Sequence, residues 1–146
     1  MLQFMEWHGN QITAAQSAAF SDMDPLFFQT LQQITPDTGA VFVILDGDLL
    51  LGLAAIERCQ LQNSNAVRLC GVTVQPQYRR QGLARTLLSL AAGKAMEFGA
   101  YLLYTHAPQT AIAQMFCAAV GFVQDTKDPA YLMLDLTDTK GMRHGG

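Results

Sequence analysis

The residues best suited to chemistry lie in the middle of the chain, in the run Arg79-Arg80-Gln81-Gly82-Leu83-Ala84. They follow a strand-like segment and open a helix-like one. The first turn of a helix exposes backbone N–H groups that have no partner within the helix, and the helix dipole adds partial positive charge there. Small side chains at Gly82 and Ala84 let a phosphate approach this backbone closely. With Arg79 and Arg80 beside it, the segment predicts an anion site suited to a pyrophosphate. Taken alone, the two arginines also fit solvated surface charges.

The helix that presents this site is predicted from apolar residues at helical spacing, namely Ala84, Leu87, Leu88, Ala91 and Ala95. Gly99 is placed to end it. Before the site, the run 66–74 is rich in β-branched residues and reads as a strand. Pro76 interrupts the chain between the two elements. The anion site is therefore expected in a loop that joins a strand to a helix.

The remaining elements follow from the same periodicities. Asp24 and Pro25 are typical of a helix start, and Asp46-Gly47-Asp48 is typical of a hairpin turn. The helix from Pro25 is expected to bury an apolar face made of Leu26, Phe27, Leu31 and Ile34. In all, we expect strands over 2–7, 41–45, 49–59, 66–74, 101–105 and 131–136, and helices over 12–20, 25–34, 81–98 and 110–120.

The order of these elements is β-α-α-β-β-β-α-β-α-β, which predicts an α+β fold with a mixed sheet. A strand, a helix and a second strand follow one another from 66 to 105, so those two strands should run parallel. The length of 146 residues fits one domain, which we place at 1–137. Residues 138–146 are expected to form a flexible tail.

Composition excludes several functional classes. The net charge is -3, and the longest basic cluster is the Arg79-Arg80 pair, which disfavours a nucleic-acid binder. The three cysteines, Cys59, Cys70 and Cys117, form no C-x-x-C pair, and the three histidines are equally scattered, so no metal site is expected. Residues Met1 to Glu6 lack the basic start and long apolar run that are typical of a signal peptide, and no apolar run reaches membrane-spanning length. We expect a soluble cytoplasmic protein.

The segment around the anion site resembles the acetyl-CoA-binding motif of the GNAT acetyltransferases, [RQ]-x-x-G-x-[GA], which here reads Arg79 to Ala84. The customary V-x-P upstream is present as Val74-Gln75-Pro76. A second family pattern, N-x-x-A-x-x-[LM]-Y-x-x-x-G-F, is matched by Ala113, Gly121 and Phe122. Thr110 replaces its asparagine and Cys117 replaces its tyrosine. The resemblance spans nearly the whole chain in element order.

The resemblance implies a GNAT fold that binds acetyl-CoA where two parallel strands splay apart. Backbone groups of Val72, Thr73 and Val74 would contact the pantetheine arm and the thioester carbonyl. Backbone N–H groups of Arg80, Gln81, Gly82, Leu83 and Ala84 would hold the pyrophosphate. Arg79 would add charge, and Thr110 would take the place of the family's cofactor-binding asparagine.

The residues that would handle protons are less defined. By the resemblance, Cys117 stands where a tyrosine protonates the departing thiolate, but a small free cysteine on an apolar helix is more often a buried core residue. Glu57 is a candidate base, or else a solvated charge at a strand edge. Tyr104 and His106 are further candidates on the neighbouring strand.

The acceptor is expected between the first two helices, where Asp22 is free to meet a cationic amine and Phe27 and Phe28 are core or pocket lining. Two functions stay open. The first is an N-acetyltransferase acting on a primary amine of a small molecule or peptide, with acetyl-CoA as cosubstrate. The second is a non-catalytic acyl-CoA-binding regulatory protein on the same fold. In either case, exposed apolar strands make a homodimer possible.

Overall fold

The computed structural model describes residues 1–8, 11–18, 20, 25–58 and 66–137 of the chain. Within them a seven-stranded sheet has the order β1-β2-β3-β4-β5-β7-β6. The strands are β1 (Leu2–Trp7), β2 (Gly39–Asp46), β3 (Leu49–Arg58), β4 (Ala66–Val74), β5 (Leu102–His106), β6 (Val123–Gln124) and β7 (Tyr131–Asp135). Only β4 and β5 pair in parallel, and all other neighbours are antiparallel. The expected α+β mixed sheet is confirmed.

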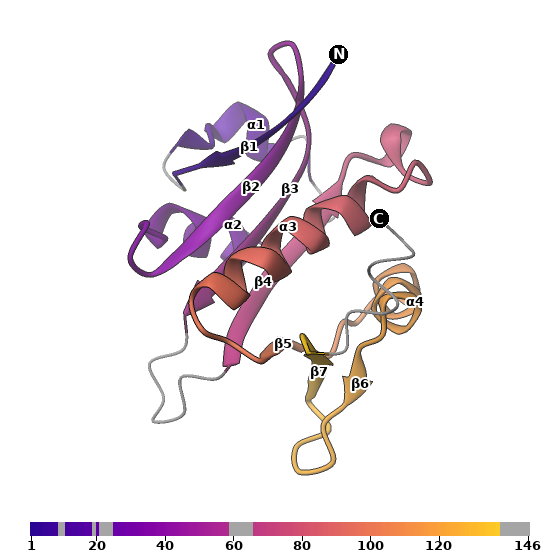
Figure 1. Cartoon of the computed structure of the whole chain (residues 1–146). Coiled ribbons are helices and arrows are strands. Elements are labelled where there is room, and N and C mark those ends of the chain that lie inside the picture. The colour runs from indigo at the N-terminus through magenta and orange to yellow at the C-terminus, as the bar shows by residue number, and fades with distance from the viewer. Residues whose placement is uncertain (9–10, 19, 21–24, 59–65, 138–146) are drawn as a thin grey trace.

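Four α-helices and one short 3-10 helix are found in the described ranges. They are α1 (Ala14–Ala18), α2 (Pro25–Gln33), η2 (Pro76–Tyr78), α3 (Leu83–Glu97) and α4 (Ala111–Val120). Figure 1 shows α3 lying across the sheet close to β2, β3 and β4, and α4 near β5 and β7.

Two separate cores hold the helices against opposite faces of the sheet. Leu87, Leu88 and Ala91 of α3 pack with Leu103 of β5 and Cys117 of α4, and we call this side of the sheet the α3 face. Phe27 and Leu31 of α2 pack with Val41, Val43 and Leu53, and we call this side the α2 face. Since neighbouring residues of a strand point to opposite faces, each strand contributes to both cores. The helix α3, with the loop before it, and the helix α2 therefore cover opposite faces of one sheet.

The helix ends follow the sequence signals. Thr13 Oγ1 accepts from Gln16 N and Gln16 Oε1 accepts from Thr13 N, which is a capping box that starts α1 two residues later than expected. Thr110 caps α4 by accepting from Ala113 N at 3.2 Å. Gly99 and Gly121 end α3 and α4 at positive φ, as only glycine does without strain.

Two expectations about these elements were wrong. Leu26 is 63% exposed, so the buried face of α2 comprises Phe27 and Leu31, followed by Ile34 just beyond the helix, without Leu26. The strand β6 and the 3-10 helix η2 were not expected, because elements of two and three residues are too short to show a period. Some predictions fall outside the described residues: those on Asp22, on Asp24 as a cap, on Cys59 and on the tail 138–146.

Candidate active site

The start of α3 has free backbone donors. The first bond of the helix runs from Thr86 N to Gly82 O at 3.0 Å, and no side chain caps this end. The N–H groups of Leu83, Ala84 and Arg85 therefore lack an intrahelical partner. Gly82 has φ 77, and no atom lies within 4 Å of the position that its Cβ would occupy. An anion thus meets open space in front of unpaired donors, which supports the site expected there.

Three arginines surround this helix start. Arg79 Nε donates to Val74 O at 3.0 Å and ties the loop to the end of β4. Arg80 is exposed, and Arg85, which the motif does not include, sits half-buried in the first turn. The first turn of α3 contains no acidic residue. Cations at the positive end of a helix dipole are unfavourable by themselves, so this arrangement favours an anionic ligand.

Arg80 is the only described residue other than glycine with a positive φ, at 67. This left-handed conformation costs a side-chain-bearing residue about 1 kcal/mol. We expect Arg80→Gly to raise the free energy of unfolding by about 0.5–1 kcal/mol in urea titrations. Gln81→Gly, a control in the same exposed loop but without a positive φ, is expected to lower it. If both variants shift the free energy of unfolding in the same direction, the backbone of Arg80 is not strained.

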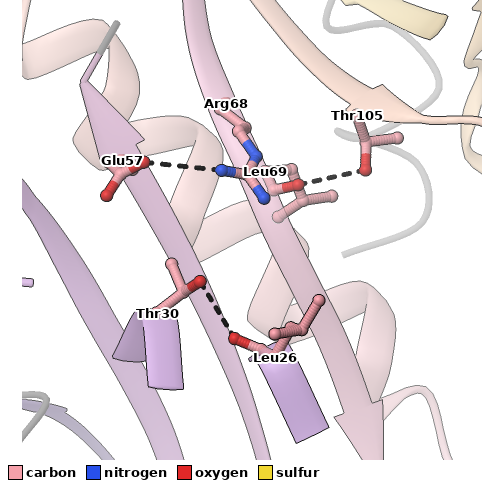
Figure 2. A network of polar contacts seen from close by, with 6 residues as sticks. All are labelled: Leu26, Thr30, Glu57, Arg68, Leu69 and Thr105. Atoms are coloured by element: carbon pink, nitrogen blue, oxygen red, sulfur yellow. Dashed lines mark hydrogen bonds and ion pairs between the residues drawn. The ribbon is translucent and has the colours of Figure 1, made fainter. Parts of the chain in front are cut away.

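The second feature of the site is a split between β4 and β5. Their pairing covers Ala66–Arg68 and Leu102–Tyr104 and then ends, although β4 continues to Val74. Thr105 Oγ1 donates to Leu69 O at 3.0 Å and bridges the closed end of the split (Figure 2). The register also skips Cys70, since Ala55 faces Gly71 while Ile56 faces Leu69. Cys70 is therefore a β-bulge, which redirects the strand at this point.

The hydrogen bonds at the end of β4 show which backbone groups face the split. Gln75 N donates to Leu51 O of β3 at 2.8 Å, whereas Val74 O accepts from Arg79 on the other side of the strand. Backbone groups alternate in direction along a strand, so the N–H groups of Val74 and Val72 point toward the split. These are two of the three residues expected to contact the thioester arm. Thr73 points its backbone toward β3 instead.

Gln75 anchors the end of β4 and was not singled out from the sequence. Its side chain is 6% exposed, its Nε2 donates to Leu50 O at 2.5 Å, and its Oε1 accepts from Gln77 Nε2 at 3.0 Å. The variable position of the V-x-P pattern gives no sign of this role. The buried amide holds the loop that leads to Gly82 against β3.

Replacing Gln75 with alanine is expected to lower the free energy of unfolding by about 1–3 kcal/mol, because the buried Leu50 carbonyl loses its donor. Urea unfolding followed by circular dichroism measures this change. Gln77→Ala is the matched control, because Gln77 is exposed and its substitution removes only the contact to Gln75 Oε1. An equal effect of the two substitutions would show that the buried bond adds nothing.

Glu57 and Arg68 lie side by side on β3 and β4 (Figure 2). Glu57 Oε1 and Arg68 Nη1 are 3.5 Å apart, and both side chains are 33% exposed. Cys70 lies near this pair and packs against the core of the α2 face. Its burial raises the pKa of the thiol from 9.0 to about 12, with Arg68 lowering it and Glu57 raising it by smaller amounts. Glu57, the candidate base, is thus an ion-paired carboxylate on the α2 face.

The candidate acid is in the opposite core. Cys117 is 8% exposed and packs among the apolar residues of the α3 face. Burial raises the pKa of its thiol, which keeps the group protonated at neutral pH. Thr110, expected to contact the cofactor, uses its hydroxyl to cap α4.

Tyr104 and His106 form an aromatic group with Tyr131 of β7. The ring centroids of Tyr104 and Tyr131 are 5.9 Å apart, and those of His106 and Tyr131 are 4.6 Å apart. Leu103 packs on the α3 face, so Tyr104 and His106 point to the α2 face. Both residues were candidates because they belong to the strand after α3, and the register pairs Tyr104 with Arg68 at the last pair before the strands diverge.

The described residues contain neither a cluster of metal ligands nor a membrane-spanning helix. Among them no three His, Cys, Asp or Glu side chains gather as metal ligands would. In the same ranges no helix is both long and apolar enough to cross a membrane.

Comparison with known proteins identifies the fold. A GNAT-family protein from Desulfovibrio desulfuricans is 14% identical, with a TM-score of 0.76 over 93% of this chain and 99% of that one. A GNAT-family acetyltransferase from Staphylococcus aureus is 15% identical, with a TM-score of 0.72 over 93% and 99%. A Bacillus anthracis protein solved in complex with acetyl coenzyme A is 17% identical, with a TM-score of 0.59 over 70% and 65%. No curated protein matches the sequence significantly.

The sequence itself gives the assignment. It matches the model of the acetyltransferase (GNAT) family over residues 3–122, a range that runs from β1 to the glycine and phenylalanine after α4. This range contains the loop at the start of α3 and the whole β4–β5 split. The chain therefore belongs to the GNAT family of acetyltransferases.

Proposed function

We propose that this acetyltransferase transfers the acetyl group of acetyl-CoA to a primary amine of a small molecule or a peptide. The observation that carries the proposal is the combination of two features at the end of β4. There β5 no longer pairs with β4, and α3 begins with uncapped N–H groups. One elongated anionic ligand suits both features, because its phosphates need the helix start and its arm needs an unpaired strand edge.

The residues of this chain fit acetyl-CoA, which supplies an activated acetyl thioester when it is bound. Backbone N–H groups from Arg80 to Ala84 would hold the pyrophosphate, with charge from the arginines around them. Val72 and Val74 would offer N–H groups to the pantetheine arm and the thioester carbonyl. Donors placed in advance stabilise the negative charge that develops on such a carbonyl oxygen during attack.

The reaction also requires two proton transfers. The amine nitrogen bonds to the acetyl carbon, the carbon–sulfur bond breaks, the nitrogen gives up a proton and the sulfur takes one up. Glu57 is our candidate for accepting the first proton, since it is a carboxylate on the α2 face that pairs with Arg68 at the closed end of the split. Cys117 is our candidate for supplying the second, because burial raises the pKa of its thiol and keeps the proton in place. Cys117 packs in the α3-face core, so a purely structural role is its alternative.

The experiment that tests the proposal measures release of free CoA thiol from acetyl-CoA across a panel of amines, amino acids and peptides. Binding of acetyl-CoA is measured by calorimetry on the same protein. Release with one class of amine supports the transferase. Binding without release for any amine supports the non-catalytic regulatory protein, and absence of binding overturns both.

A further inference from the structure

Arg68 stands at the closed end of the split, on the side of the sheet away from α3. Its neighbours Val67 and Leu69 pack in the core of the α3 face, so Arg68 points to the α2 face. It pairs in register with Glu57 on β3 and with Tyr104 on β5. The pair with Tyr104 is the last one before the two strands diverge. Figure 2 shows Arg68 between Glu57 and the bond from Thr105 to Leu69.

The guanidinium of Arg68 has unused capacity. Its Nε is buried and has no hydrogen-bond partner among the described residues. Its ion pair with Glu57 spans 3.5 Å between Nη1 and Oε1, so within the described part of the chain the contact is loose. A buried donor without a partner is unfavourable, and an arginine presents its donors as a fork that matches a carboxylate. The neighbouring Cys70 thiol cannot supply the missing negative charge, because its pKa is raised to about 12.

The surroundings of Arg68 suit an organic acid. Tyr104, His106 and Tyr131 form a group of contacting rings on the same face, and His106 is exposed. Glu57 beside Arg68 supplies a negative charge for an ammonium group. A molecule with both an amine and a carboxylate therefore meets a complementary pair of charges next to an aromatic surface.

Resting on the proposed function, we propose that Arg68 binds a carboxylate of the acetyl acceptor, so that the acceptor is an amine that carries a carboxylate, such as an amino acid. The carboxylate accepts from N–H groups of the guanidinium, and the ammonium lies toward Glu57. This places the acceptor at the closed end of the split, on the same strand as Val72, the nearest of the residues that would contact the thioester arm. Arg68 is then a residue that determines specificity, and it takes no part in proton transfer.

The test compares matched acceptors that differ only in the carboxylate, for example L-phenylalanine with L-phenylalaninamide, and glycine with glycinamide. We expect kcat/KM to favour the acid of each pair by about tenfold or more, as a charge-assisted bidentate contact would. The preference runs against intrinsic reactivity, since the amide has the less basic amine and is deprotonated more readily. Arg68→Gln should abolish the preference, and Arg68→Lys should restore part of it.

The control variant is Arg58→Gln. Arg58 lies on β3 next to Glu57, but its guanidinium sits 4.9 Å from the Phe98 ring centroid at the end of α3. The Arg58→Gln substitution removes the same charge and should leave the preference for the acid over the amide unchanged. Calorimetry with acetyl-CoA should give the same affinity for all three variants. Equal or better turnover of the amides, or a preference that persists in Arg68→Gln, overturns the inference while the transferase stands.

A second measurement does not need turnover. Binding of N-acetyl-L-phenylalanine and of its amide is followed by ligand-observed NMR with the wild-type protein and with Arg68→Gln. We expect the acid to bind the wild type at least about tenfold more tightly, and the difference to vanish in the variant. If no amine releases thiol but this difference is found, the transferase fails and the carboxylate site stands. If the acid does not bind preferentially, the carboxylate site is wrong.

Discussion

Gly82→Glu is expected to weaken acetyl-CoA binding at least about a hundredfold, as measured by calorimetry. The carboxylate would stand in the open space before the uncapped N–H groups of α3, where it would occupy the donors and repel a pyrophosphate. Gly82 also has φ 77, so any side chain there adds about 1 kcal/mol of backbone strain. The expected loss of affinity is larger than strain alone produces.

The other end of the same helix provides the control. Gly99 has φ 89, and no atom lies within 4 Å of its Cβ position, so Gly99→Glu introduces the same strain and the same charge. It should leave the affinity for acetyl-CoA within about twofold, because it lies beyond the C-terminal end of α3. If the two variants bind acetyl-CoA equally, the anion site has been placed at the wrong end of α3.

Local signals in the sequence predicted the frame of this site correctly. The strand 66–74 has the observed bounds, and four of the five residues assigned to the buried face of α3 are fully buried, with Ala84 partly so. These predictions succeed because periodicity and glycine placement are properties of one continuous segment. The loop from Arg79 to Ala84 is also one continuous segment, and the positive φ of its glycine, which was not expected, came to light only in the structure.

What the sequence did not reveal depends on contacts between distant segments. Gln75 bonds to a carbonyl 25 residues earlier, and Thr105 bonds to one 36 residues earlier. The role that we propose for Arg68 depends on its register with Glu57 and Tyr104, which no local pattern encodes. Leu26 was expected to be buried because helical spacing gives the angle of a side chain, whereas the extent of the partner surface decides whether it is covered.

The pH dependence of stability tests the environment of Arg68 from another direction. The folded-state pKa of Cys70 is about 12 and its ordinary value is 9.0, so the thiol stays protonated in the folded protein while the unfolded chain loses its proton. Cys70 therefore stabilises the fold fully below about pH 9, and this contribution is lost as the pH rises toward 12. Between about pH 9 and 11 we expect it to remove roughly 2–3 kcal/mol from the free energy of unfolding.

Cys70→Ala isolates this contribution, because lysines and tyrosines titrate alike in both proteins. Urea unfolding at several pH values gives the free energy of unfolding of each protein against pH. Below about pH 9 the two curves should differ by a constant, because only the loss of the larger side chain separates the two proteins there. Above that pH the wild type should lose stability faster than the variant. Parallel curves up to about pH 11 would mean that Cys70 is open to water. If the bulge is solvated, water also reaches Arg68 and satisfies its unpaired Nε donor, and the argument that this donor favours a carboxylate ligand no longer holds.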